Sequence, residues 1–312
     1  MKISRRAFLG GLGGLGAGWL AGRVWPVNAQ TTGDDPDVRL LSARIRETIG
    51  AEAVGLDLRR INWNRGTVDF SIQHNAENYY PSASTFKAMT VLYYLAMTPR
   101  DLWEVGADSS AYRVAVFSNN RLTGDLLDST AAHYPGRANP IVKFNNWTRE
   151  ALRMDVGLYS WDWEGSPTVG WNDRRFAPTP ERAVWHRGAA YAVGNVFQPR
   201  HLADFWSYLL TLRPLYGWRQ AEEAVAQTLE LFSIPASGYQ SPIERAWGNY
   251  IGKDGVLPAG DTPLNVRVVN DAGIILVGQT PYVVAAMSLN GEYRFIQTLE
   301  RVLAHVVAYE SV

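Results

Sequence analysis

The spacing of apolar residues predicts a chain in which helices and strands alternate. Leu40, Leu41, Ile45 and Ile49 fall at helical spacing before Gly50, which favours an amphipathic helix that ends at this glycine. Other segments are rich in β-branched residues and bounded by Gly, Pro or Asn, which favours strands. The predicted elements are a helix at 38–49, strands at 53–61 and 67–73, helices at about 84–97, 202–212 and 221–231, strands at 266–269, 272–277 and 282–289, and a helix at 293–309.

The middle of the chain, from about residue 101 to residue 199, is helical only in patches. It is crowded with Gly, Pro and Trp, and we interpret its tryptophans as packing aromatics of a loop-rich region. The order of elements predicts an α/β (α+β) fold: an antiparallel sheet flanked by the N- and C-terminal helices, with an all-helical block beside it. We assign 38–80 and about 240–312 to the α/β part and about 81–239 to the helical part, within one domain at 30–312.

The first 29 residues have the features of an export signal. Arg5 and Arg6 precede an apolar, glycine-rich run at 10–22, and 27–29 offers the small residues that a signal peptidase recognises. A paired arginine before a weakly hydrophobic run is similar to the twin-arginine signal. An uncleaved anchor is the alternative, but the run is short for a membrane span. We therefore expect a periplasmic or otherwise exported protein, carried across the inner membrane by the twin-arginine route, with no stable membrane insertion once processed.

The composition argues against several classes of protein. The chain is 46% hydrophobic and 19% charged, which suits a folded core. Thirty basic residues balance thirty acidic ones, so net charge gives no reason to expect a nucleic-acid partner. There is no cysteine, which excludes disulfides and thiolate sites, and the five histidines include no pair at helical ligand spacing. We expect no metal, no cofactor and a monomer that acts on a small molecule.

The segment 81–87 contains the first candidate catalytic residues, Ser84 and Lys87. A serine hydroxyl is a poor nucleophile until a neighbouring group takes its proton. In the first turn of a helix, the amide groups would favour negative charge at Ser84, and Lys87 would lie on the same face three residues later. Burial near a second cation would lower the pKa of this lysine and let it act as a base. A Ser-x-x-Lys pair alone also fits a capping serine with a surface lysine.

Two further elements follow in an order that strengthens this interpretation. Ser118 and Asn120 begin another helical stretch, where a hydroxyl could relay a proton and an amide could bind a substrate carbonyl. Lys253-Asp254-Gly255 comes just before the last pair of strands. A glycine there would let a substrate lie close to the strand edge. The backbone amides of Val256 and Ser84 could then form an oxyanion hole.

Taken together, Ser84-Thr85-Phe86-Lys87, Ser118-Asn119-Asn120 and Lys253-Asp254-Gly255 resemble the three signature elements of the class A β-lactamases and their penicillin-binding relatives. The predicted order of helices and strands is also similar to that fold over essentially the whole mature chain. The resemblance implies one role for each of these residues: Ser84 is the acylated nucleophile, Lys87 its proton partner, Ser118 the proton relay, Asn120 a substrate amide contact and Lys253 the electrostatic anchor.

The sequence departs from the family pattern at three places. Asp254 replaces the usual Thr or Ser, and its carboxylate would repel a substrate carboxylate. The stretch between the first two elements is shorter than usual, which implies a smaller helical block. The deacylating glutamate has two candidates: Glu164, which follows a tryptophan as in the family's Ω-loop, and Glu181. An ordinary surface glutamate is the alternative for either. Arg267 could contact a substrate carboxylate or be an ordinary strand-edge arginine.

The resemblance implies an exported serine hydrolase that opens β-lactam rings through an acyl-enzyme on Ser84, with water activated by Glu164. Two alternatives remain. A peptidoglycan D,D-peptidase, or another amidase or esterase on the same scaffold, would fit a chain without a deacylating base; in the peptidase case the substrate is a peptidoglycan stem peptide. A catalytically silent binding protein would fit the change at Asp254.

Overall fold

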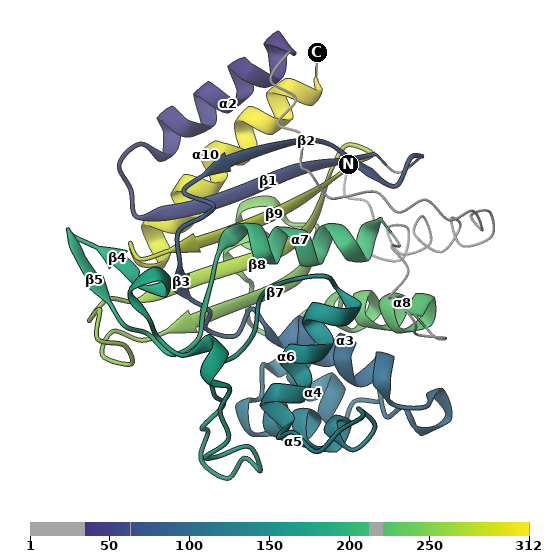
Figure 1. Cartoon of the computed structure of the whole chain (residues 1–312). Coiled ribbons are helices and arrows are strands. Elements are labelled where there is room, and N and C mark those ends of the chain that lie inside the picture. The colour runs from purple at the N-terminus through teal and green to yellow at the C-terminus, as the bar shows by residue number, and fades with distance from the viewer. Residues whose placement is uncertain (1–34, 63, 212–220, 312) are drawn as a thin grey trace.

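Five antiparallel strands form the central sheet of this computed structural model, which describes residues 35–62, 64–211 and 221–311 (Figure 1). The strand order is β2-β1-β9-β8-β7, so β7 lies at one edge. Each neighbouring pair runs antiparallel. The strands are β1 (Val54–Asn62), β2 (Thr67–His74), β7 (Tyr250–Leu257), β8 (Val268–Val277) and β9 (Thr280–Ser288). The predicted export signal lies outside the described residues.

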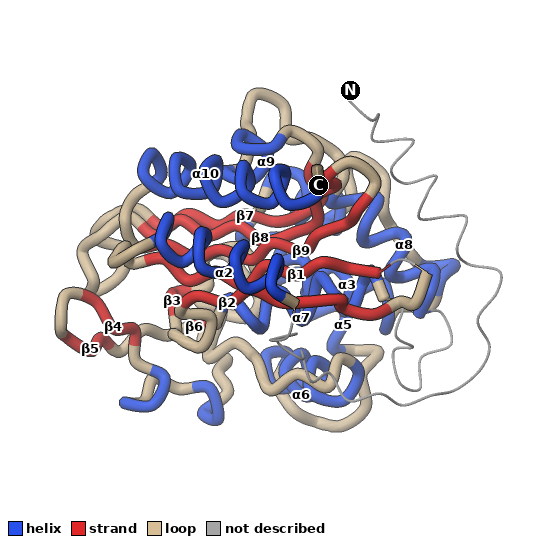
Figure 2. The backbone as a smooth tube through the Cα atoms, turned by 90° about the horizontal axis from the view of Figure 1, so that it is seen from above, coloured by secondary structure: helices blue, strands red, loops and turns tan. Residues whose placement is uncertain are grey.

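The two terminal helices cover one face of this sheet. α2 (Pro36–Ile49) and α10 (Glu292–Glu310) pack against each other, and α9 (Pro242–Trp247) lies beside α10 (Figure 2). The Asp35 carboxylate caps α2 at its start, and the helix ends at Gly50, which has a positive φ. Leu41, Ile45 and Ile49 of the predicted apolar stripe are buried, whereas Leu40 is 51% exposed, so period and burial agree at three of its four positions.

A third helix, α7 (Pro199–Leu210), covers the opposite face and packs against β1, β8 and β9. A buried polar group joins it to the sheet: Arg59 on β1 contacts Asp57 at 2.7 Å and Asp204 on α7 at 2.6 Å. Sequence analysis included this helix in the helical part, but the structure places it on the sheet.

The remaining helices form the helical block below the sheet (Figure 1). They are α3 (Lys87–Met97), α4 (Ser110–Phe117), α5 (Asn120–Ala131), α6 (Pro140–Ala151) and α8 (Ala221–Phe232). Every residue of α3 is buried, because α4, α5, α6, α8 and β7 surround it. A helix that is apolar on all sides is stable only in such a core position.

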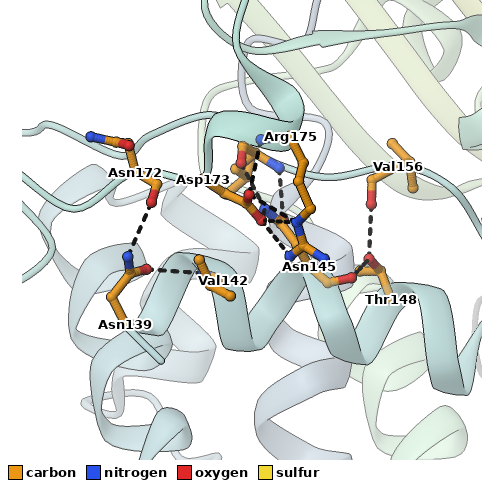
Figure 3. A network of polar contacts seen from close by, with 9 residues as sticks. Asn139, Val142, Asn145, Thr148, Val156, Asn172, Asp173 and Arg175 are labelled. Atoms are coloured by element: carbon orange, nitrogen blue, oxygen red, sulfur yellow. Dashed lines mark hydrogen bonds and ion pairs between the residues drawn. The ribbon is translucent and has the colours of Figure 1, made fainter. Parts of the chain in front are cut away.

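A long segment between α6 and α7 wraps around the block. It contains the 3₁₀ turns η2 (Arg174–Phe176) and η3 (Pro180–Arg182), the hairpin β4 (Val184–His186) and β5 (Ala189–Tyr191), and β6 (Val196–Phe197), which pairs with β3 (Tyr80–Pro81). Asn145 of α6 holds the segment through hydrogen bonds to both backbone groups of Leu158 and to the Asp173 carboxylate (Figure 3). Arg175 adds an ion pair to Asp173 at 2.5 Å.

The predicted fold class is confirmed: an antiparallel sheet carries terminal helices, with a helical block alongside. Two boundaries differ. The two short strands expected around residues 266–277 are one strand, β8. Lys253, Asp254 and Gly255 lie within β7 rather than before the strands. Among the described residues, no helix combines the length and apolar character needed to cross a bilayer.

Candidate active site

Ser84 lies in a tight turn between the short strand β3 and helix α3. The helix begins at Lys87 rather than at Ser84, and the Lys87 amide donates to the Ser84 carbonyl at 3.1 Å. Ala83 has φ 48°, a left-handed conformation that is uncommon for alanine and that bends the chain just before Ser84. On β8, Asn270 donates to the carbonyl of Pro81 at 2.6 Å, so the sheet fixes this turn. The serine side chain is partly exposed.

Lys87 is fully buried and points away from solvent. Its ammonium donates to the carbonyl and the hydroxyl of Ser118, at 2.6 and 3.0 Å, and to Oδ1 of Asn120 at 2.5 Å. Burial and the nearby Lys253 ammonium lower the pKa of Lys87 well below its ordinary value, and Asp254 opposes this only in part. The predicted pair of lysines therefore converges, and one of them is set to lose its proton.

Ser118 adopts a strained backbone conformation at the junction of α4 and α5. Its φ of 55° and ψ of 35° are left-handed, and it forms the C-cap of α4. Asn119 then caps α5 by accepting from the Leu122 amide at 3.0 Å. This break directs the carbonyl and the hydroxyl of Ser118 to the same ammonium. Strain of this kind in a non-glycine residue is concentrated at functional sites in proteins.

Lys253 projects from β7 and pairs with its own neighbour. Its ammonium contacts the Asp254 carbonyl and carboxylate, both at 2.8 Å. The other carboxylate oxygen accepts from the Tyr239 hydroxyl at 2.6 Å. Burial raises the pKa of Asp254, but Lys253 and Tyr239 outweigh that effect and hold it below the ordinary value. The carboxylate is therefore ionised near neutral pH.

Gly255 brings the edge strand directly against the nucleophile turn. A Cβ at this position would lie 2.4 Å from the Ser84 amide nitrogen and 2.8 Å from the Ala83 Cβ. Only glycine permits this approach. Val256 follows on the same strand, so its amide and that of Ser84 are the two candidate oxyanion donors.

Trp161 is the site residue that the sequence did not single out. Its ring lies 5.0 Å from that of Phe86 and 5.6 Å from the Lys87 ammonium. Its indole NH donates to the Asn120 carbonyl at 3.0 Å. Trp163 stacks on it, with ring centres 6.4 Å apart. The cluster of tryptophans between residues 147 and 185 was the available signal, and we had interpreted it as packing alone.

The two candidate deacylating glutamates and Arg267 lie outside this group. Glu164 is exposed in the turn after Trp163 and bonds to no other described residue. Glu181 is exposed in η3. Arg267 precedes β8 and pairs with Glu292 at 2.9 Å, so it has a structural partner at the surface. The structure thus assembles Ser84, Lys87, Ser118, Asn120 and Lys253–Val256, while Glu164 faces solvent.

A buried acid behind the site was also missed. Asp271 on β8 lies directly across from Asp254 in the strand register. Its carboxylate accepts from the Tyr250 hydroxyl and from the Ile243 amide, the latter at 2.7 Å. Full burial and the Asp254 charge raise its pKa to about 7. The polar pair Asn270-Asp271 inside an apolar run was the sequence signal.

Comparisons with known proteins bear on the fold. No protein-family model matches the chain, and no curated protein matches it in sequence. Solved structures do match. The β-lactamase of Sphaerobacter thermophilus is 15% identical with a TM-score of 0.57, covering 87% of this chain and 97% of that one. The TLA-1 extended-spectrum β-lactamase is 12% identical with a TM-score of 0.57, covering 88% and 99%.

A third structure, the β-lactamase of Streptosporangium roseum, is 12% identical with a TM-score of 0.53 and covers 87% of this chain and 99% of that one. At these identities the likeness concerns architecture. It spans nearly the whole of each matched protein, including the sheet, the terminal helices and the helical block. The resemblance noted in the sequence is thereby confirmed at the level of structure, and the chain has the fold of the class A β-lactamases.

Proposed function

We propose that this protein is a serine hydrolase that cleaves an amide or ester bond through an acyl-enzyme on Ser84. The observation that carries the proposal is the surroundings of Lys87: the lysine is buried, and its nearest charged neighbours include a second ammonium. A lowered pKa increases the fraction of Lys87 that is the neutral amine, the form that a general base requires.

The chemistry follows from the arrangement around the turn. The Ser84 hydroxyl oxygen attacks the substrate carbonyl carbon, and its proton passes to the neutral Lys87 amine. The amides of Ser84 and Val256 stabilise the oxyanion. Ser118, which contacts the Lys87 amine at 3.0 Å, returns the proton to the leaving group. Water then hydrolyses the acyl-enzyme and frees Ser84.

Opening of a β-lactam ring is the first reaction to test, because the similar solved structures are named β-lactamases. The exposed position of Glu164 supports a second candidate, an amidase, esterase or D,D-peptidase whose acyl-enzyme is freed slowly. Steady nitrocefin turnover that disappears in Glu164→Gln would favour the first reaction. A burst followed by a stalled acyl-enzyme, seen by intact mass, would favour the second.

The proposal itself is tested by labelling with an uncharged fluorophosphonate followed by peptide mapping. We expect the label on the peptide that contains Ser84 and no label in Ser84→Ala. The matched control is Ser129→Ala, a serine exposed on α5, which should be labelled like the wild type. Failure to label the wild type would favour a catalytically silent binding protein instead.

We also propose that the protein acts outside the inner membrane, exported by the twin-arginine route, and that its substrate is a small molecule. The support is the paired arginine and apolar run before residue 30. Replacement of Arg5 and Arg6 by lysine should retain the protein in the cytoplasm, which fractionation would detect.

A further inference from the structure

The group of side chains around Ser84 contains a cation that already has an anionic partner. The Lys253 ammonium contacts the Asp254 carboxylate at 2.8 Å, and both side chains are largely buried, with 6% and 16% of their surface exposed. An ion pair shielded from water keeps its mutual attraction, so Lys253 offers little net positive charge to a third group.

The carboxylate of this pair is fixed in place rather than free to turn away. Lys253 binds one oxygen and the Tyr239 hydroxyl binds the other at 2.6 Å. Both interactions favour the ionised form, and the pKa of Asp254 lies below its ordinary value. A substrate group that approached Lys253 would therefore meet a fixed negative charge.

The other two ionisable groups near the site make its net charge more negative. Lys87 loses its proton readily because of burial and Lys253. Asp271, across from Asp254 on β8, has its pKa raised to about 7 and is partly ionised at neutral pH. Lys253 and Asp254 contribute one charge of each sign, so together they add nothing to the net charge of the site. The sum over these groups lies between zero and one negative charge when Lys87 is neutral.

The two exposed aromatic residues near the site fit an uncharged or cationic group. Trp163, 47% exposed, stacks on Trp161 next to Lys87. Tyr239, 42% exposed, bonds to Asp254 at the edge strand. Aromatic faces attract cations and apolar groups alike, and a neighbouring carboxylate adds to the attraction for a cation.

From this distribution of charge we infer that the substrate of the Ser84 site carries no negative charge next to its scissile acyl group: it is a neutral or cationic amide or ester, selected by Asp254. The inference rests on the proposed acyl-enzyme chemistry and narrows its substrate class. It disfavours every substrate with a free carboxylate beside the scissile bond. These include the stem peptides of the D,D-peptidase alternative and carboxylate-bearing β-lactams such as nitrocefin, so it favours the amidase or esterase reaction.

The experiment uses three p-nitrophenyl esters whose acyl chains have the same length and end in a trimethylammonium, a tert-butyl or a carboxylate group. In each reaction the Ser84 oxygen forms an ester with the acyl carbon, the bond to p-nitrophenolate breaks, and Lys87 takes the serine proton. Release of p-nitrophenolate measures acylation whatever the natural substrate is. We expect the carboxylate ester to react about tenfold or more slowly than the neutral one, and the cationic ester at least as fast as the neutral one.

The variant Asp254→Asn keeps the shape of the side chain and removes its charge, which leaves Lys253 unpaired. We expect it to accelerate the carboxylate ester relative to the neutral ester by about tenfold or more. The control Glu47→Gln removes one negative charge from an exposed position on α2, on the far face of the sheet. It should keep the wild-type order of the reaction rates of the three esters.

The outcomes separate the two proposals. Equal rates for the three esters, or a preference for the carboxylate ester, would overturn the charge selection while leaving Ser84 acylation intact. If Asp254→Asn left the order of the three reaction rates unchanged, Asp254 would not be the residue that selects the substrate charge. If the wild type releases p-nitrophenolate from no ester faster than Ser84→Ala does, the acyl-enzyme itself has failed and the inference falls with it.

Discussion

The two lysines of the cleft have different partners, and the difference gives each a separate role. Lys87 bonds to neutral oxygens of Ser118 and Asn120, whereas Lys253 bonds to the carboxylate of Asp254. Burial with only neutral partners disfavours the charged form of an amine, and this lowers its pKa. Lys87 is therefore suited to exchange a proton, and Lys253 to shape the field around it.

The different roles of the two lysines predict that Lys253→Met and Asp254→Asn shift the pH dependence of acylation in opposite directions. Rates with a neutral ester should rise with pH as Lys87 loses its proton, at a pH below the ordinary lysine range. Lys253→Met removes the ammonium that lowers the pKa of Lys87, so the rise should move to higher pH. Asp254→Asn removes the charge that raises this pKa, so the rise should move to lower pH. Shifts in the same direction would contradict the assignment of Lys87 as the base.

The contact between Gly255 and the nucleophile turn predicts a second effect. A methyl group there would lie 2.4 Å from the Ser84 amide nitrogen, so Gly255→Ala should displace one oxyanion donor. We expect acylation to slow by about 100-fold, the usual effect of losing such a donor. Gly106→Ala is the control, because a Cβ there has no neighbour within 4 Å. Stopped-flow measurement of the burst would show whether the two variants differ.

Residue types at fixed spacing were enough to predict Ser84, Lys87, Ser118, Asn120 and Lys253 as a group, because each motif lies within one turn or strand. Tyr239, Trp161 and Asp271 could not be found in this way. They reach the cleft from segments that only the folded chain brings together, and their neighbours in sequence form no motif.

Among the elements, those with a single apolar face were predicted within a few residues, since period and burial agree in them. β7 was not, because its sequence Tyr250–Leu257 contains Gly, Lys and Asp, which in isolation favour a turn. Pairing with β8 along its whole length overrides that preference. The short strands of the segment between α6 and α7 were missed because a strand of two or three residues is too short to show an alternation of apolar and polar positions.

Asn145, Thr148 and Asn139 of α6 all donate to that segment, but only Asn145 bonds to both backbone groups of one residue, which predicts a difference between the two asparagines. Asn145→Ala would leave both backbone groups of Leu158 without their partner, and it should lower the free energy of unfolding by about 2–4 kcal/mol. Asn139→Ala removes a half-buried N-cap and its bond to the Asn172 carbonyl, and it should cost about 1 kcal/mol. Denaturant unfolding would compare them, and similar losses would show that Asn145 does not hold the segment (Figure 3).

In the molecule as a whole, the candidate site lies where the sheet edge meets the helical block. Ser84 comes from the turn before α3 and Lys87 from the first residue of that helix. Ser118 and Asn120 come from the α4–α5 junction, and Lys253 from β7. Because β7 packs between the block and β8, a group on β8 affects both the site and the stability of the sheet. Asp271 is such a group: it is fully buried and hydrogen-bonded within the fold.

Asp271 predicts a decline in global stability as the pH rises toward neutral. Its pKa is about 7 in the folded protein and near 3.8 in the unfolded chain, so between these values the folded state binds more protons than the unfolded state. The free energy of unfolding should then fall with increasing pH, at up to about 1.4 kcal/mol per unit from this group. Asp271→Asn should flatten the profile over that window, as urea titrations at several pH values would measure.

A second variant tests the cause of the decline. The Tyr250 hydroxyl donates to the Asp271 carboxylate and lowers its pKa, so Tyr250→Phe should raise that pKa and extend the decline to higher pH. If loss of the charged carboxylate alone controlled the free energy of unfolding, both variants would change its slope against pH in the same direction. We expect opposite changes. Asp271→Asn removes the titrating group, whereas Tyr250→Phe removes the hydrogen bond that stabilises its ionised form. A decline that persisted in Asp271→Asn would assign the pH dependence to a different group.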